Sequence, residues 1–201
     1  MPSTQQGHHV DPCERRIVTP AEQQEIFWKF NHSAFRVETL DTYAVVDDDR
    51  VLREYVNGGI NPPFTDSGWT AWYDRVKAAV SAGKEMVRVH LIPEVLTPYL
   101  RYEIEWAYTL FNAPAGEKVY LVNIDRHPRF VELRGRDFYL FDASSVLEIN
   151  FDGSQLKNME FDNTPGTVSK FTGLRDELMK VAVPLSDYLK MMREAPLRVS
   201  F

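Results

Sequence analysis

The stretch from residue 137 to residue 162 constrains the fold of this chain more than any other segment. Apolar side chains recur in it with a period of two, so that neighbours such as Phe138 and Tyr139 face opposite sides of a strand. The alternation is interrupted at residues 143–145 and at Asp152-Gly153, and Asp-Gly is a strong signal for a tight hairpin turn. The segment therefore predicts three short strands in an antiparallel meander.

The preceding chain predicts a β-α-β unit, with strands at 84–93 and 118–125 and a helix at 97–112 between them. With the meander, this unit predicts an α+β fold, in which a mixed sheet with a C-terminal antiparallel meander carries helices on its faces. Further elements are predicted as helices beginning after Thr19, Asp49, Ser67 and Thr164, and as a strand pair or one long bent strand at 35–46.

Residues 1–18 carry mixed polar residues without a period, and we expect a mobile N-terminal tail there. The whole chain has 201 residues, of which 44% are hydrophobic and 12% aromatic, enough to fill a sizeable core. Residues 19–201 are therefore predicted to form a single α+β domain.

Charge and cysteine content limit the expected partners and compartment. The formal net charge is -6, which does not favour direct contact with nucleic acid or an anionic membrane. The single Cys13 cannot form an internal disulfide, residues 1–16 lack the apolar segment of a signal peptide, and no apolar run approaches the roughly 18 residues of a membrane helix. We expect a cytoplasmic protein.

Five separated motifs carry a family resemblance: Ser33 to Tyr43, Val87 to Val89, Pro98 to Glu103, Asp137 to Asp142 and Val183 to Leu189. On these motifs, the chain resembles an uncharacterised actinobacterial family of domains of unknown function, over roughly residues 26–190. Members of that family often lie beside small helix-turn-helix regulators in their genomes. The resemblance therefore implies a regulatory protein partner.

A fainter likeness is to half of a phospholipase-D-like domain. That family's half-site needs a His, a Lys two residues later and an Asp farther along the chain. Here His127 is followed by Pro128 and Arg129, and Arg134 stands where the Asp would fall. An arginine cannot orient a nucleophilic imidazole as a carboxylate does, so this likeness implies the fold without the activity.

The densest basic segment contains four arginines and one histidine in a loop between predicted strands: Arg126, His127, Arg129, Arg134 and Arg136. Guanidinium groups match the geometry of phosphate and carboxylate, so these side chains are candidate ligands for a small anion. In an enzyme, His127 would be the general acid or base, since its ordinary pKa lies near neutrality. The alternative interpretation is a solvated loop whose charges serve solubility.

The helix predicted at 97–112 supplies a second candidate binding site. Tyr102 and Trp106 share one helical face, and Arg101 lies on an adjacent face where it can pair with Glu105. These residues could line a pocket for a flat ligand. Alternatively, the aromatic side chains simply pack the helix against the sheet.

No motif indicates a metal, a cofactor or nucleophilic catalysis. The Asp residues at strand ends are typical of turns, and the five histidines show no zinc-ligand spacing. There is no nucleophile elbow and no glycine-rich phosphate loop. We therefore expect a non-enzymatic cytoplasmic interaction protein with a regulatory role. The alternative is an enzyme or ligand-binding protein for a small anionic metabolite that uses the basic segment 126–136.

Overall fold

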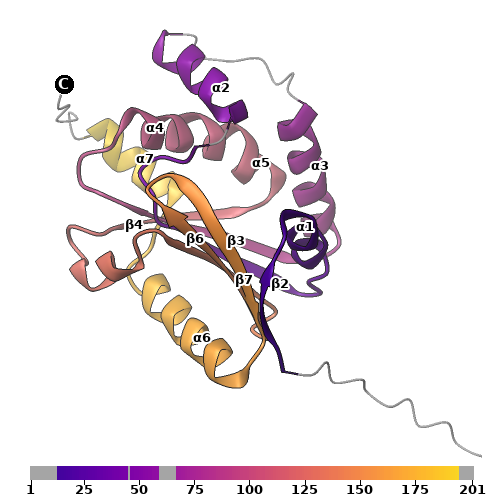
Figure 1. Ribbon diagram of the computed structural model, residues 1–201. Coiled ribbons are helices and arrows are strands. Elements are labelled where there is room, and N and C mark those ends of the chain that lie inside the picture. The colour runs from indigo at the N-terminus through magenta and orange to yellow at the C-terminus, as the bar shows by residue number, and fades with distance from the viewer. Residues whose placement is uncertain (1–12, 45, 59–66, 195–201) are drawn as a thin grey trace, which may run out of the picture.

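A computed structural model describes residues 13–44, 46–58 and 67–194. The described residues form one eight-stranded sheet with strand order β1-β7-β6-β5-β2-β3-β4-β8 (Figure 1). The strands are β1 (Arg15–Val18), β2 (Ser33–Glu38), β3 (Glu85–Ile92), β4 (Lys118–Asn123), β5 (Arg136–Phe141), β6 (Ser145–Asp152), β7 (Gln155–Asp162) and β8 (Val183–Pro184).

The sheet is mixed, as predicted. Strands β2, β3 and β4 run parallel to one another, while every other neighbouring pair is antiparallel. The predicted meander is confirmed as β5, β6 and β7, and Gly153 adopts a positive φ of 59° in its second turn. The first turn contains Asp142 and Ala143, both with positive φ, which are tolerated in tight hairpin turns.

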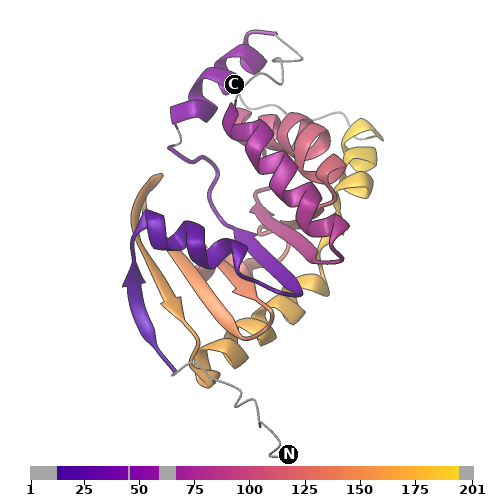
Figure 2. The ribbon, with the colours of Figure 1, turned by 90° about the vertical axis from the view of Figure 1, so that its right-hand side faces the viewer.

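Helices cover both faces of the sheet, which confirms the α+β class. The helices are α1 (Pro20–Trp28), α2 (Val46–Val56), α3 (Ser67–Ser81), α4 (Pro98–Tyr102), η1 (Glu103–Asn112), α5 (Ala113–Ala115), η2 (Pro128–Leu133), α6 (Pro165–Met179) and α7 (Leu185–Glu194). Helix α6 lies on one face, and the larger group that includes α1, α3, α4 and α7 lies on the other (Figures 1 and 2). Within the described ranges, no helix is long and apolar enough to cross a membrane.

Each face has its own hydrophobic core. Under α6, side chains such as Val37, Val89 and Phe138 pack against Phe171 and Leu178. On the opposite face, two apolar clusters lie beneath α1 with α3 and beneath α4, η1 and α7. The second face also carries four charged or titratable side chains, those of Arg36, Glu38, Arg88 and His90. They alternate along β2 and β3 with apolar residues that face α6.

Three predictions of local structure are wrong. Residues 15–18 are not tail, because they pair with β7 as strand β1; residues 1–12 lie outside the described ranges. The strand predicted at 35–46 ends at Glu38, since the amide of Thr39 bonds to the Asp137 carboxylate rather than to a neighbouring strand. The helix predicted at 97–112 is α-helical only to Tyr102 and continues as the π-helix η1.

Candidate functional site

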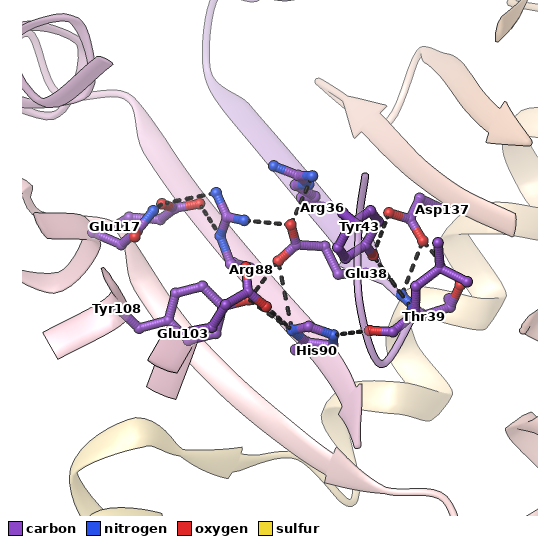
Figure 3. Close-up of polar contacts among 12 residues, drawn as sticks. Arg36, Glu38, Thr39, Tyr43, Arg88, His90, Glu103, Tyr108, Glu117 and Asp137 are labelled. Carbon is purple, nitrogen blue, oxygen red and sulfur yellow. Dashed lines mark hydrogen bonds and ion pairs between the residues drawn. The ribbon is translucent and has the colours of Figure 1, made fainter. Parts of the chain in front are cut away.

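Two parallel strands place charged side chains next to one another inside the fold. In the register of β2 and β3, Arg36 lies opposite Arg88 and Glu38 lies opposite His90. All four point to the helix-rich face, while Val37 and Val89 between them point to the α6 face. Figure 3 shows how this row meets side chains from η1 and from the loop after β2. We call the whole set the buried network: Arg36, Glu38, Thr39, Tyr43, Arg88, His90, Glu103, Tyr108, Glu117 and Asp137.

Ion pairs neutralise much of the charge in the buried network. A guanidinium nitrogen of Arg88 lies 2.6 Å from Glu38 Oε1, and its Nε lies 3.1 Å from Glu117 Oε1. Arg36 also contacts Glu38 Oε1, at 2.6 Å. Burial alone would raise the pKa of Glu38, but these two guanidinium groups hold that pKa well below its ordinary value. Glu117 in addition accepts from the side-chain amide of Asn112 at 2.5 Å.

The π-helix η1 brings two more acid–base groups to the same place. Glu103 and Tyr108 are five residues apart, and a π-helix, whose backbone hydrogen bonds join residues i and i+5, places them on the same side. The phenol oxygen of Tyr108 lies 2.8 Å from Glu38 Oε2 and 3.1 Å from Glu103 Oε2. Because π-helical turns are rare and often occur at functional sites, this element marks the region as the candidate site.

His90 lies at the centre of the buried network and is fully enclosed. Its Nδ1 is 2.6 Å from Tyr108 Oη and 3.3 Å from Glu103 Oε2, and its Nε2 is 2.9 Å from the carbonyl oxygen of Leu40. Burial opposes a charge on this ring, but the contact with Glu103 and the nearby Glu38 carboxylate outweigh it. The pKa of His90 is therefore raised above its ordinary value.

Asp137 of β5 holds the loop after β2 in place through hydrogen bonds. Its Oδ1 accepts hydrogen bonds from the amide and hydroxyl of Thr39, both at 2.9 Å, and its Oδ2 accepts from Tyr43 Oη at 2.7 Å. Burial raises the pKa of Asp137 to about 6, although the nearby Arg36 and these hydrogen bonds oppose the rise. Asp137 and His90 thus both bind their protons more tightly than in an unfolded chain.

Asp142, directly after β5, has the turn role that its position indicates. Asp142 accepts from three consecutive backbone amides, those of Asn31, His32 and Ser33, each at 2.7 Å. Burial opposes charge on Asp142, but these three bonds lower its pKa overall. Among the described residues, no group of three or more His, Cys, Asp or Glu side chains is placed to hold a metal ion.

The structure separates the arginines of the basic segment 126–136. Arg126 pairs with Glu94 at 2.8 Å, Arg129 lies 3.6 Å from Glu177, Arg134 pairs with Asp41, and Arg136 lies 2.5 Å from Glu148. These four carboxylates lie on different elements, and the arginine side chains are about half exposed. His127 is half-buried at the start of η2. Their role in anion binding stays a prediction.

The aromatic candidates of the helix 97–112 lie in the hydrophobic core. Tyr102 and Trp106 are buried and stack with their ring centroids 5.3 Å apart. Arg101 lies at the surface, 4.0 Å from Glu105. The structure thus brings Tyr102 and Trp106 together as core residues, and a ligand-binding role for the three residues stays a prediction.

Sequence reasoning missed the buried network, although one signal for it exists. Arg36 and Glu38 alternate with Val37, and Arg88 and His90 alternate with Val89, inside segments that otherwise read as buried strands. Charges at alternate positions of a strand normally indicate a solvated face. Here the same positions face η1, so the pattern indicates charges buried between a sheet and a helix.

The surface of the described residues has depressions, and two of them are candidate binding sites. The first, of about 330 Å³, lies between η1 and α7 and is called the η1–α7 groove; it is lined by Glu105, Thr109, Leu189, Met192 and Arg193. The second, of about 170 Å³, lies between η2, α6 and the sheet; its lining includes Leu133, Arg136, Phe138, Lys170, Phe171 and Leu174. Neither is lined by residues of the buried network.

Comparison with solved structures gives distant likenesses. NucT from Helicobacter pylori superposes with a TM-score of 0.45 at 10% identity, over 85% of this chain and 97% of that one. TrmBL2, an archaeal chromatin protein with a novel mode of DNA binding, superposes with a TM-score of 0.48 at 9% identity, over 84% of this chain and 53% of that one. This chain thus spans about half the length of TrmBL2. At TM-scores below 0.5, these likenesses support no inference about function.

No curated protein matches this sequence. A family model does match it, over residues 21–190, which is most of the chain and nearly the range of the five motifs. The chain therefore belongs to the family described as Domain of unknown function (DUF6879).

Proposed function

We propose that this protein is a non-enzymatic regulatory module of the cytoplasm that binds a partner protein through the η1–α7 groove. The observation that carries the proposal is the groove itself, where two large apolar side chains, Leu189 and Met192, form one wall. Leu110, which follows Thr109 in η1, is 40% exposed. Flexible methionine side chains on a surface are typical of sites that accept apolar segments of a partner.

The charges at the groove define the chemistry of the partner. Glu105 is occupied, because Tyr55 Oη donates to it and Arg101 lies 4.0 Å away. Arg193 lines the groove, and no carboxylate among the described residues pairs with it. The partner segment that fits best is therefore an amphipathic helix with an apolar face for Met192 and an acidic residue for Arg193.

The state of the buried network supports a binding role over a catalytic one. Its two guanidinium groups pair with carboxylates of the network itself, as in the contacts of Arg88 with Glu38 and Glu117, although the buried Nε of Arg36 has no hydrogen-bond partner. A catalytic acid or base must instead reach a substrate atom within hydrogen-bond distance. The regulatory part of the proposal rests on the family resemblance alone, which implies that members often lie beside helix-turn-helix regulators.

The test uses two preparations of the protein. One carries a photo-crosslinking amino acid at Thr109, in the groove, and the other carries it at Lys157, an exposed position on β7. A partner captured from cell extract at Thr109 alone is then purified, and its affinity is measured by calorimetry. Met192→Lys should weaken binding about tenfold or more, because it places a charge on the apolar wall. Met191→Lys, on the neighbouring exposed position, is the matched control and should bind like the wild type.

Two results would overturn the proposal: equal capture at both crosslinking positions, or equal affinity of the two methionine variants. A helix-turn-helix regulator as the captured partner would support the regulatory role.

The second depression favours another candidate function, the binding of a small anionic metabolite. Arg136 and Lys170 line it together with the buried rings of Phe138 and Phe171. Two carboxylates, Glu132 and Glu148, line it as well, and Arg136 pairs with Glu148, so Lys170 is the cation that would meet an anionic ligand. About 170 Å³ is enough for a phenyl-sized group, since an engineered apolar cavity of about 150 Å³ binds benzene. Aromatic carboxylates should then raise the Tm of the wild type and of the exposed control Lys157→Met, but not the Tm of Lys170→Met. No rise with any of them would exclude this candidate.

A further inference from the structure

The hydrogen bond of His90 to the loop after β2 fixes one of its ring protons. The Nε2 atom lies 2.9 Å from the carbonyl oxygen of Leu40, and a carbonyl oxygen can only accept. The Nε2 atom therefore carries a hydrogen in any state that keeps this bond. The remaining question is whether Nδ1 carries a second one, which would make the ring an imidazolium.

The contacts of Tyr108 decide the state of Nδ1. Its phenol has one hydrogen, yet its oxygen lies 2.6 Å from His90 Nδ1, 2.8 Å from Glu38 Oε2 and 3.1 Å from Glu103 Oε2. If the ring is neutral, the phenol hydrogen goes to Nδ1, and two close oxygen–oxygen contacts are left without a hydrogen. If the ring is an imidazolium, Nδ1–H donates to the phenol, and the phenol donates to Glu38.

The charge balance of the buried network points the same way. Glu38, Glu103 and Glu117 supply three carboxylates, while Arg36 and Arg88 supply two guanidinium groups. Among these five groups, one carboxylate is left without a counter-charge, and the imidazolium of His90 provides it. Asp137 adds a further negative charge to the network above its pKa of about 6. This matters because uncompensated charge inside a fold is costly.

Every element packed around His90 contributes a group that responds to this charge. The strands contribute Glu38 and Arg36 from β2, Arg88 from β3 and Asp137 from β5 (Figure 3). Glu103 and Tyr108 belong to η1, Glu117 follows α5, and Tyr43 lies in the loop after β2. Tyr99 of α4 reaches the outer oxygen of Glu103 at 3.3 Å. The ring thus joins β3 to the loop on one side and to η1 on the other.

The same helix carries the wall of the η1–α7 groove. Glu103 and Tyr108 face inward to His90, while Glu105 and Thr109 line the groove outside. We propose that the second ring proton of His90 locks η1 against the sheet and thereby makes partner binding in the groove dependent on pH. The lock stands on the buried network alone, whereas its effect on binding rests on the proposed function.

The direction of the effect follows from the proton count. As the pH rises, Nδ1 gives its proton to solvent and becomes an acceptor for the phenol hydrogen of Tyr108. Glu38 and Glu103 then lose their hydrogen-bond donors at the phenol and at Nδ1, and η1 is held less firmly. Hydrogen exchange in η1 should therefore accelerate, and the partner should bind more weakly, in alkaline solution.

The test is amide hydrogen exchange by mass spectrometry, from about pH 6 to about pH 9.5, with rates corrected for intrinsic exchange. In the wild type, the protection of η1 should fall by about tenfold or more across one titration step, because a buried acceptor that loses its donor costs about a factor of ten in stability. The glutamine side chain of His90→Gln can still donate to the carbonyl oxygen of Leu40, but it does not titrate. In this variant the protection of η1 should be low and should not show that step. The strand β6 serves as the internal control.

Tyr108→Phe provides a second variant if His90→Gln does not fold, and it should remove the same step. Equal protection of η1 in wild type and variants, or a step that survives in both variants, would overturn the lock. Partner affinity that is flat with pH while the exchange step is present would overturn the coupling to the groove. Loss of affinity in Met192→Lys is measured separately, so a failure of the groove proposal is distinguished from a failure of the lock.

Discussion

The Nδ1 atom of His90 lies 2.6 Å from the phenol oxygen of Tyr108, and this contact joins the central strand β3 to the π-helix η1 inside the fold. Both residues are buried, and the two carboxylates nearest to them belong to β2 and η1. A contact of this kind ties three elements together through polar atoms in a place where apolar packing would be expected. Its consequences can be measured.

Removal of the phenol hydroxyl should destabilise the protein. In Tyr108→Phe, Glu38 and His90 each lose a buried hydrogen-bond partner, so the free energy of unfolding should fall by about 1–3 kcal/mol. The matched control is Tyr120→Phe on β4, where the ring is half-buried and should cost well under about 1 kcal/mol. Urea unfolding followed by circular dichroism measures both. Equal losses in the two variants would contradict the buried role of Tyr108.

Arginines at the centre and at the surface should differ strongly in their contribution to stability. Arg88→Met leaves the carboxylates of Glu38 and Glu117 buried without a shared counter-charge, which should cost about 3–5 kcal/mol. Arg126→Met breaks only the exposed pair with Glu94 and should cost about 0–1 kcal/mol. The comparison is made by thermal and chemical unfolding in the same buffer. A small loss in Arg88→Met would show that the buried ion pairs are dispensable.

Stability should decline between about pH 5 and pH 7 because of Asp137. Its folded-state pKa, about 6, is above the ordinary value, so the folded state binds this proton more tightly than the unfolded state. Its stabilising contribution is therefore complete below the ordinary pKa and is lost as the pH rises through about 6. Between pH 5 and pH 7 the loss should reach about 1 kcal/mol, and His90, whose pKa is also raised, extends it to higher pH.

The variant Asp137→Asn isolates this effect. Its carbonyl oxygen can still accept both bonds from Thr39, and its amide can donate to Tyr43 Oη, so the neutral form is imitated. Between pH 5 and pH 7, the urea midpoint of this variant should change less than that of the wild type. A wild-type protein that becomes more stable over this interval would contradict the raised pKa.

A glycine between helix and strand should tolerate no side chain. Gly116 has φ 103°, and a Cβ atom there would lie 2.8 Å from Val80 Cγ1. In Gly116→Ala, the free energy of unfolding should therefore fall by about 1–2 kcal/mol because of the backbone conformation. It should fall by a further amount because the new Cβ atom clashes with α3. Gly153→Ala, with φ 59° and open space around it, should show the backbone cost alone. Calorimetric unfolding of the two variants compares the costs, and a milder loss at Gly116 would contradict this packing.

Local patterns were sufficient to predict much of the fold. The meander β5–β7 follows from strict alternation and the Asp152-Gly153 turn, both of which are signals within a few residues. The helix α1 begins after Thr19, as predicted, where Thr19 and Glu22 form a capping box. Strand β1 was missed because Arg15 to Val18 has only four residues, and its pairing partner β7 lies about 140 residues later.

The candidate site could not be predicted because it depends on contacts that are distant in sequence. His90 and Leu40 are 50 residues apart, and Tyr108 and Glu38 are 70 residues apart. The residues meet because β2 and β3 are parallel and in one register, which periodicity within a strand does not reveal. Likewise, a helical pattern does not distinguish an α-helix from the π-helix that aligns Glu103 with Tyr108.

The most direct test of this account is the protonation state of the His90 ring, read from its ¹⁵N chemical shifts in the folded protein, with His90→Gln used to assign the signals. The account predicts that at neutral pH both ring nitrogens of His90 carry hydrogen, and that this state persists above the pH at which exposed histidines lose their charge. A neutral ring at that pH, protonated at Nε2 alone, would contradict it and would leave the surplus proton on a carboxyl group such as that of Glu103.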